Sequence, residues 1–587
     1  MTYAAPAQEI AFALESVAGL ADAREAGAIN ELSSEDTLAI LTEAARFAEE
    51  VLAPLNTAGD HHHSTLRDGE VSTPPGWKEA YAAWVEAGWG SLTGDPAHGG
   101  QGLPMALQVA ATDIWNQANS AFALNPLLTI GAVEALDLHG SEALKATYLE
   151  KMISGAWTGT MNLTESHAGS DLSLLRTRAE PSGDGTYRLF GQKIYITYGE
   201  HDLSENIIHF VLARLPDAPE GTRGISLFLV PKVLVNADGT LGARNDVAAV
   251  GVEKKLGLHA SPTCTMAYGA NGEGALGYLV GEPNKGLAAM FVMMNNARVQ
   301  VGMQGAAIAE RAYQHAFAYA KERKQGRAPG HEGMAPIVNH PDVKRMLLSM
   351  KALTQASRAI CYACAVAIDR GRTDPAWKAR ADLLTPIAKA FPTDVGVEVA
   401  SIGIQVHGGM GYVEETGAAQ YYRDGRIFPI YEGTNGIQAI DLIKRKITMD
   451  DGAVLNAYLS ELSGIAEAAR GANDLDLAAV ARRLDEAVSA VSEVAGEIRA
   501  ALKANDPAQG DRALAAATPF LRALGLTAGG AYLTKAALKA PNGSAEPRAA
   551  LARFFAHSHV AGVPELARGS LLCGTDVAGA SAEALAL

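Results

Sequence analysis

One carboxylate stands where the chain passes from an apolar run into a glycine-rich turn, in the stretch 430–436 (Ile-Tyr-Glu-Gly-Thr-Asn-Gly). Burial without a neighbouring cation disfavours the charged form and raises the pKa of a carboxyl group, which suits Glu432 to act as a general base. Gly433 lets a ligand approach the backbone, while Thr434 and Asn435 are suited to cap a following helix and to donate to an anion. A helix cap with an exposed glutamate is the second interpretation, and these residues alone leave both open.

Two motifs precede this stretch, at 405–412 (Gln-Val-His-Gly-Gly-Met-Gly-Tyr) and 422–424 (Tyr-Arg-Asp). In this order the three resemble the C-terminal signature of the acyl-CoA dehydrogenase family, whose catalytic base is the Glu of a similar Tyr-Glu-Gly-Thr element. The resemblance covers roughly residues 80 to 447, and it is specific because four separated motifs recur in the family's order. It implies that Glu432 removes a proton from the substrate.

The segment 161–171 (Met-Asn-Leu-Thr-Glu-Ser-His-Ala-Gly-Ser-Asp) resembles the family's flavin loop. A flavin ring needs hydrogen-bond donors at N1, C2=O and N5, and Thr164 and Ser170 stand where the family places such groups. The resemblance also places Ser170 beside the pantetheine arm of the thioester. Read without the family, this segment is an exposed loop rich in serine and glycine. Tyr195 and Thr197 belong to a Tyr-Ile-Thr that resembles the Trp-Ile-Thr beside the flavin in the family.

Arg323 ends a long helical pattern, where a cation is favourable as a cap on its own account. In the family the corresponding arginine reaches the FAD pyrophosphate, often of the neighbouring subunit, and Gln405 with 408–409 matches the segment that cradles the adenosine diphosphate. Arg298 matches the substrate-side arginine. Some relatives carry the base immediately before that arginine, but this chain has Ala297 there.

The resemblance therefore implies two sets of ligand contacts besides the base Glu432. The residues expected to bind FAD are Met161, Leu163, Thr164, Ser170, Tyr195, Thr197, Arg323, Gln405, Gly408, Gly409, Thr434 and Gly436. The residues expected to bind substrate are Ser170, Asn295, Arg298 and Gly433. The chain departs from the family pattern in having Ser166-His167 for Pro-Gly, Tyr195 for Trp, Asn295 for an acidic residue, and Pro341 and Gly436 for Gln.

Composition describes an ordinary globular protein of 587 residues, 48% hydrophobic and 19% charged. The net charge of −16 disfavours a non-specific nucleic-acid binder. Four cysteines make a disulfide framework improbable and favour a reducing, cytoplasmic compartment. No apolar run approaches the roughly 18 residues of a membrane span, and no basic residue precedes Arg24, so the N-terminus predicts no secretory signal. No metal site is predicted: we interpret 61–63 as solvated histidines and the Cys361/Cys364 pair as core residues.

Periodicity predicts helices up to about residue 157, with 34–55, 77–87 and 104–121 as segments and a polar, turn-rich stretch at 56–75. Strand patterns follow at 187–197, 206–215 and 224–235, and long helices at 284–323, 341–370, 376–404 and 434–446. Beyond residue 446 an apolar stripe at helical spacing, 477–498, predicts a helical extension. We therefore expect an α+β fold with a helical domain (1–157), a β-barrel domain (158–280), a four-helix bundle (281–447) and a helical extension (448–587).

The expected activity is the FAD-dependent oxidation of an acyl-CoA thioester to a trans-2-enoyl-CoA, with electron-transfer flavoprotein as the electron acceptor and a homodimer as the assembly. The resemblance extends to large bacterial members such as 3-(methylthio)propanoyl-CoA dehydrogenases, and the acyl chain is left open between this substrate and short, medium or long fatty acyl groups. Two alternatives share the fold: an acyl-CoA oxidase, which reduces oxygen directly, and a DNA-associated relative, which needs a basic surface.

Overall fold

The computed structural model describes residues 3–29, 32–472, 474–504, 506–541 and 543–586. The chain forms two compact units. Unit 1 comprises Met1–Ala45, Met105–Gln117 and Arg298–Leu587, and unit 2 comprises Arg46–Pro104 and Ala118–Ala297. Because these units divide the chain differently from the four domains expected from sequence, the bounds of those domains stay a prediction.

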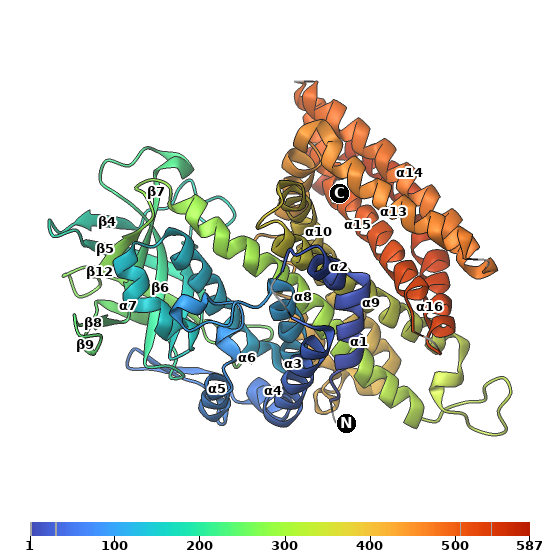
Figure 1. The fold of residues 1–587 in the computed structure, drawn as a ribbon, viewed down its shortest axis with the longest axis horizontal. Helices are drawn as coiled ribbons and strands as arrows, with labels where there is room; N and C mark the ends of the chain where they lie inside the picture. The colour runs from blue at the N-terminus through green and yellow to red at the C-terminus, as the bar shows by residue number, and fades with distance from the viewer. Residues whose placement is uncertain (1–2, 30–31, 473, 505, 542, 587) are drawn as a thin grey trace. The chain divides into compact units, whose positions relative to one another are not determined.

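Unit 2 is built on an eight-stranded sheet with the order β10-β11-β5-β12-β7-β6-β3, in which β4 pairs with β5 and β6 (Figure 1). Its strands are β3 (Trp157–Asn162), β4 (Arg178–Pro181), β5 (Tyr187–Thr197), β6 (Asn206–Arg214), β7 (Ile225–Pro231), β10 (Val247–Val252), β11 (Thr263–Tyr268) and β12 (Ala275–Val280). Two small ribbons accompany it, formed by β1 (Thr65–Arg67) with β2 (Glu70–Ser72) and by β8 (Val233–Val235) with β9 (Leu241–Arg244). The strands β3 and β6 run parallel.

Side-chain alternation along β6 explains how the sheet builds two cores. Ile208, Phe210 and Leu212 belong to one buried cluster, which includes helical residues from the range 127–153. Val211 and Ala213 belong to a second cluster, formed with residues of the other strands. Successive residues of a strand face opposite sides, so a strand covered on both faces is mostly apolar. All residues of β6 except Arg214 are accordingly buried.

The N-terminal helices differ from the predicted bounds in two places. They are α1 (Ala7–Phe12), η1 (Ala13–Val17), α2 (Leu20–Glu25), α3 (Ser34–Phe47), η2 (Ala48–Leu52), α4 (Ala53–His61), α5 (Trp77–Glu86), η3 (Trp89–Ser91), η4 (Pro96–His98), α6 (Met105–His139) and α7 (Glu142–Ile153). The predicted loop 56–75 is wrong in its first part, because α4 continues to His61. Helix α6 runs 18 residues past its predicted end at Ala121, across a non-helical residue at Asn119.

The bundle of unit 1 contains long helices that start at prolines, as predicted: α9 (Pro341–Arg370) and α10 (Pro375–His407). They pack with α8 (Gly286–Glu322). The connecting elements of the bundle are η6 (Ile337–Asn339), η7 (Gly408–Tyr412), η8 (Glu414–Thr416), α11 (Ala418–Gly425), α12 (Asn435–Asp441) and η9 (Leu442–Lys446), whereas the short turn η5 (Gly221–Gly224) lies in unit 2 between β6 and β7. A Cβ at Gly302 would lie 1.8 Å from the carbonyl oxygen of Ala388. Only glycine therefore allows α8 and α10 to approach this closely.

The predicted helical extension is present as α13 (Ala453–Gly471), α14 (Leu475–Lys503), α15 (Pro507–Leu538), α16 (Ala545–Ser558), α17 (Val563–Gly579) and α18 (Ala582–Ala586), with short turns η10 (Met449–Gly452) and η11 (Val560–Gly562) (Figure 1). The apolar stripe of α14 is buried, from Leu477 to Ile498. Helix α15 packs closely on the bundle. A Cβ at Gly525 would lie 2.5 Å from the ring of Phe391 on α10, so the absence of a side chain at Gly525 allows this contact.

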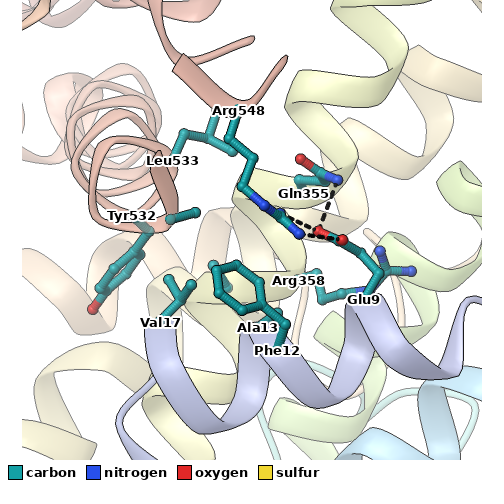
Figure 2. Close-up of a pocket in the computed structure, with 11 residues that line it drawn as sticks. Glu9, Phe12, Ala13, Val17, Gln355, Arg358, Tyr532, Leu533 and Arg548 are labelled. Atoms are coloured by element: carbon teal, nitrogen blue, oxygen red, sulfur yellow. Dashed lines mark hydrogen bonds and ion pairs between the residues drawn. The ribbon is translucent and has the colours of Figure 1, made fainter. Parts of the chain in front are cut away.

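A small cavity lies where the extension meets the N-terminal helix (Figure 2). Arg548 on α16 forms two hydrogen bonds with the carboxylate of Glu9, at 2.6 and 2.7 Å, and its guanidinium lies 4.0 Å from the ring centroid of Phe12. Gln355 on α9 donates to the same carboxylate at 3.3 Å. Charged and aromatic contacts therefore join three segments that are far apart in sequence.

Among the residues that the structure describes, α6 is long and apolar enough to cross a membrane by length and composition, but 78% of its most apolar window is buried. Within unit 1 its Asp113 pairs with the buried Arg358, with 2.7 Å between Oδ2 and Nε. These properties are typical of a core helix. Cys264, Cys361 and Cys364 are buried and Cys573 is exposed, and all four are free thiols.

Candidate active site

Glu432 lies at the tip of a tight turn between α11 and α12. The amide of Asn435 donates to the carbonyl of Pro429 at 2.9 Å and closes the turn. Glu432 and Gly433 both have positive φ, 54° and 81°. Glycine is favoured at 433, because other residues rarely adopt this φ and a Cβ there would also approach Gln438 Nε2 to 2.7 Å. Thr434 then caps α12 as predicted, because its Oγ1 accepts from the amide of Ile437 at 3.2 Å.

A buried network holds this turn from behind. Lys389 on α10 is fully buried, and its ammonium donates to the carbonyl of Phe428 and to Oδ1 of Asn435, both at 2.9 Å. Asn435 in turn donates to Asp394 Oδ1 at 2.8 Å and to the carbonyl of Ala390 at 3.1 Å. The side chain of Asn435 thus binds α10 and does not cap α12, which corrects that part of the sequence interpretation.

The carboxylate of Glu432 is partly buried and has no hydrogen bond or ion pair among the residues described in unit 1. Burial raises its pKa above the ordinary value of 4.5, while attraction to Arg298 and Lys389 opposes that rise. An unpaired carboxylate in this setting binds a proton more readily than one on the surface. It can therefore accept a proton from a bound molecule, which is the chemistry of a general base.

Arg298 is buried on α8, and burial lowers its pKa. The carboxylates of Asp441 and Glu432 oppose this fall, whereas the cation of Arg445 adds to it. A Cβ at Gly433 would lie 3.9 Å from Arg298 Nη2, so the arginine lies beside the turn. Tyr431 fixes the turn from a third side by donating its hydroxyl to Gln304 Oε1. The structure therefore brings Arg298, Gly433 and Thr434 to Glu432, and Gly436 is exposed on the first turn of α12.

In unit 2 the segment 161–171 is fastened to β5. The amide of Ile194 donates to the carbonyl of Thr164 at 2.9 Å, and Lys193 Nζ donates to the carbonyl of Leu163 at 3.0 Å. Lys193 also donates to Glu165 Oε1 at 2.8 Å. Although burial raises the pKa of Glu165, attraction and hydrogen bonding to Lys193 outweigh it and hold that pKa below its ordinary value. A buried ion pair thus fixes the loop beside Tyr195.

Tyr195 is presented to solvent by an irregularity in β5. The pairing of β5 with β11 shifts register between Ile196 and Lys193, and Tyr195 has a φ of 60° and is 61% exposed. Bulges of this kind re-aim a side chain. Nearby, the hydroxyls of Thr164, Ser170 and Thr197 have no side-chain hydrogen bond within the described part of unit 2, and each is at least partly exposed.

This combination fits a flavin, which needs a planar wall and several donors along its polar edges. Tyr195 supplies an accessible aromatic face, and three uncommitted hydroxyls supply donors. Leu163 is partly buried, whereas Met161 is buried near the end of β3, where it pairs with Phe210 of β6. Asn295 is exposed on the part of α8 that belongs to unit 2.

The residues predicted to serve a neighbour's cofactor lie together at one end of the bundle in unit 1. Arg323 follows α8 directly, and Tyr319 on that helix contacts His407 on α10, with ring centroids 4.5 Å apart. The side chains of Arg323 and Gln405 and the glycines 408–409 are exposed. Gly408 adopts φ 62° and ψ −141°, a conformation that only glycine adopts readily.

Sequence reasoning missed Lys389. A lysine inside the apolar run 386–392 was the available signal, because a cation in such a run must be paired when it is buried. Among the described residues no cluster of metal-ligating side chains is present.

Models of acyl-CoA dehydrogenase domains match three parts of the chain. A model of the acyl-CoA dehydrogenase N-terminal domain matches residues 34–156, and a model of the C-terminal domain matches residues 284–447. A third, described as acetyl-CoA dehydrogenase C-terminal like, matches residues 458–569 in the extension.

The chain is 47% identical over 547 residues to a 3-methylmercaptopropionyl-CoA dehydrogenase of Ruegeria pomeroyi, with 92% of each protein covered. Two solved structures share the fold at 21% identity and a TM-score of 0.74. One is an acyl-CoA dehydrogenase of Bacillus anthracis complexed with FAD, with 94% of both chains covered. The other is Caenorhabditis elegans ACDH-11 in complex with C11-CoA, with 92% of this chain and 89% of that chain covered. The expected fold class, with helices before and after a central sheet and further helices at the C-terminus, is confirmed, and the chain belongs to the acyl-CoA dehydrogenase family.

Proposed function

We propose that this chain oxidises a short acyl-CoA thioester to the trans-2-enoyl-CoA, with FAD as cofactor and Glu432 as the base. The observation that carries the proposal is the carboxylate of Glu432, which has no partner of its own and a pKa raised by burial. A carboxylate so placed is ready to take a proton, whereas a structural carboxylate is normally paired.

Proton removal next to a carbonyl requires that the carbonyl be polarised at the same time. Glu432 removes the proton from the carbon beside the thioester carbonyl, and a backbone N–H of the same turn donates to the carbonyl oxygen. One such donor contributes roughly 3–4 kcal/mol in comparable sites. Arg298 lies beside the turn, and its attraction opposes the rise that burial causes in the pKa of Glu432, which favours the ionised carboxylate.

FAD, when bound, supplies the two-electron acceptor for the hydride that leaves the β-carbon. The residues that would hold its ring are Leu163, Thr164, Ser170, Tyr195 and Thr197, with the backbone of Met161. Ser170 has the further role of contacting the pantetheine arm, together with Asn295. Thr434 and Gly436 would contact FAD from the turn of Glu432, since both are at least partly exposed there.

The similarity to a 3-methylmercaptopropionyl-CoA dehydrogenase supports 3-(methylthio)propanoyl-CoA as the substrate. This acyl group carries hydrogens on both the α- and β-carbons, so the same base and the same hydride acceptor oxidise it. Short, medium and long fatty acyl-CoAs are the competing substrates.

We further propose that electron-transfer flavoprotein reoxidises the enzyme and that the enzyme works in the cytoplasm as part of lipid β-oxidation chemistry. Four free cysteines support a reducing compartment. A net charge of −16 weighs against the DNA-associated alternative. The oxidase alternative, in which the enzyme reduces oxygen directly, is decided by measuring peroxide during turnover.

The expected assembly is a homodimer in which each subunit completes the cofactor site of the other. The exposed Arg323, Gln405 and 408–409 support it, because they lie next to exposed apolar side chains at Met410, Tyr412 and Val413. Light scattering should give twice the chain mass of 61.3 kDa. A monomer with full flavin content would contradict this assembly.

Replacing Glu432 with glutamine removes the base and keeps its size, so flavin and acyl-CoA binding should survive. The rate of flavin bleaching by substrate should fall by roughly 10²- to 10⁴-fold. In the unaltered enzyme, kcat/KM should fall as the pH drops through the raised pKa of Glu432, which lies above 4.5. Glu398→Gln is the matched control, because that carboxylate pairs with Arg522 in the same bundle. Near-normal bleaching in Glu432→Gln would place the base elsewhere.

A panel of acyl-CoAs tests the substrate and the electron acceptor together. Anaerobic bleaching should be fastest with 3-(methylthio)propanoyl-CoA and slower with medium and long straight chains. Turnover should depend on electron-transfer flavoprotein and yield little peroxide in air. Faster bleaching by long chains would remove the substrate proposal, and stoichiometric peroxide would favour the oxidase.

A further inference from the structure

Lys389 occupies a position from which one ammonium group reaches both ends of the turn that carries Glu432. Its side chain is fully buried, and its two hydrogen bonds, each 2.9 Å long, go to the carbonyl of Phe428 and to Asn435 Oδ1. Phe428 precedes the turn and Asn435 begins α12. A single cation thereby fixes the span within which Glu432 adopts its left-handed backbone conformation.

Three charged groups face this ammonium from the elements packed around it. They are the carboxylate of Glu432, the carboxylate of Asp394 one turn along α10, and the guanidinium of Arg298 on α8. Burial lowers the pKa of Lys389 from 10.5 to about 7, while the two carboxylates raise it and Arg298 lowers it further. The charge of Lys389 therefore changes within the working range of most enzymes.

The same attraction acts on the carboxylate. The cations of Arg298 and Lys389 both oppose the rise that burial causes in the pKa of Glu432. Burial lowers the pKa of Arg298 from 12.5, but a guanidinium keeps its charge across the working pH range of an enzyme. Lys389 is thus the titrating member of the pair of cations that act on Glu432.

We propose that Lys389 is a positioning residue for the reaction, which ties down the turn of Glu432 and whose charge keeps that carboxylate ionised until substrate arrives. The inference rests on the proposed role of Glu432 as the base. It adds a residue that touches neither substrate nor cofactor and acts through the turn of Glu432 and through the charge of its carboxylate. When Glu432 takes up a proton, it no longer attracts the ammonium of Lys389. Protonation of Glu432 therefore favours loss of the proton from Lys389.

The test compares Lys389→Met with Lys535→Met, measuring the pH dependence of kcat/KM and the flavin content. Lys535 is a suitable control, because it is a partly buried lysine of α15 whose pKa burial also lowers. The acid limb of the profile is the range in which kcat/KM falls as the pH drops. Loss of the cation beside Glu432 should move this limb in Lys389→Met to a pH about one unit higher, with about a tenfold loss of kcat/KM on the limb. The Lys535→Met profile should not move.

A milder variant keeps the inference testable if Lys389→Met does not fold or does not bind flavin. Asp394→Asn retains the carbonyl oxygen that accepts from Asn435 but removes an anion that stabilises the charge on Lys389. Its acid limb should move in the same direction by a smaller amount. An unmoved limb in flavin-loaded Lys389→Met would overturn the inference, as would an equal shift in Lys535→Met. If Lys389→Met cannot be measured, an unmoved limb in Asp394→Asn overturns it.

A double variant separates this inference from the proposed function. In the Glu432→Gln background, Lys389→Met should cause a smaller further loss in the bleaching rate than it causes in the unaltered enzyme, because the carboxylate on which its charge acts is missing. A further loss of the full size would show that Lys389 acts by another route. If Glu432→Gln alone bleaches at the normal rate, it is the proposed base that fails.

Discussion

A carboxylate without a partner is the constraint on which this structure depends. Removing an ionised group from water is costly unless charges or hydrogen bonds compensate, and Glu432 receives only the longer-range attraction of Arg298 and Lys389. Its left-handed backbone adds about 1–2 kcal/mol of unfavourable energy. The close packing of α8 on α10 at Gly302 fixes the two helices that carry Arg298 and Lys389.

The same bundle contains a second set of buried charges that shows what a structural arrangement looks like. Arg358 binds Asp113 at 2.7 Å and Glu310 at 3.1 Å. Burial alone would raise the pKa of Glu310, but Lys351 and Arg358 outweigh it and lower that pKa to about 2. Fully paired acids of this kind cannot accept a proton near neutrality. Glu432 differs from these acids because it has no partner among the described residues of unit 1. That difference, and not burial itself, suits Glu432 to accept a proton.

Sequence patterns predicted the elements well where local signals are strong. The strand 187–197 has the predicted bounds, and Pro341 marks the start of a long helix. Glu432 could be found from its motif, since glycine and a capping threonine follow it directly. Lys389 could not, because its role depends on which helix covers it. The positive φ of Tyr195 was also unreadable, since a tyrosine carries no sign of a bulge that its partner strand imposes.

Glu432 itself takes the substrate proton in the proposed reaction, and isotope exchange measures that step without oxidation. An acyl-CoA analogue with sulfur in place of the β-carbon has an exchangeable α-hydrogen but no hydride to lose. In deuterated water, NMR should show exchange at the α-carbon with the unaltered enzyme and with Glu398→Gln. Exchange with Glu432→Gln should fall by roughly 10²-fold or more, as expected for loss of the base. Equal exchange in Glu432→Gln would contradict the account.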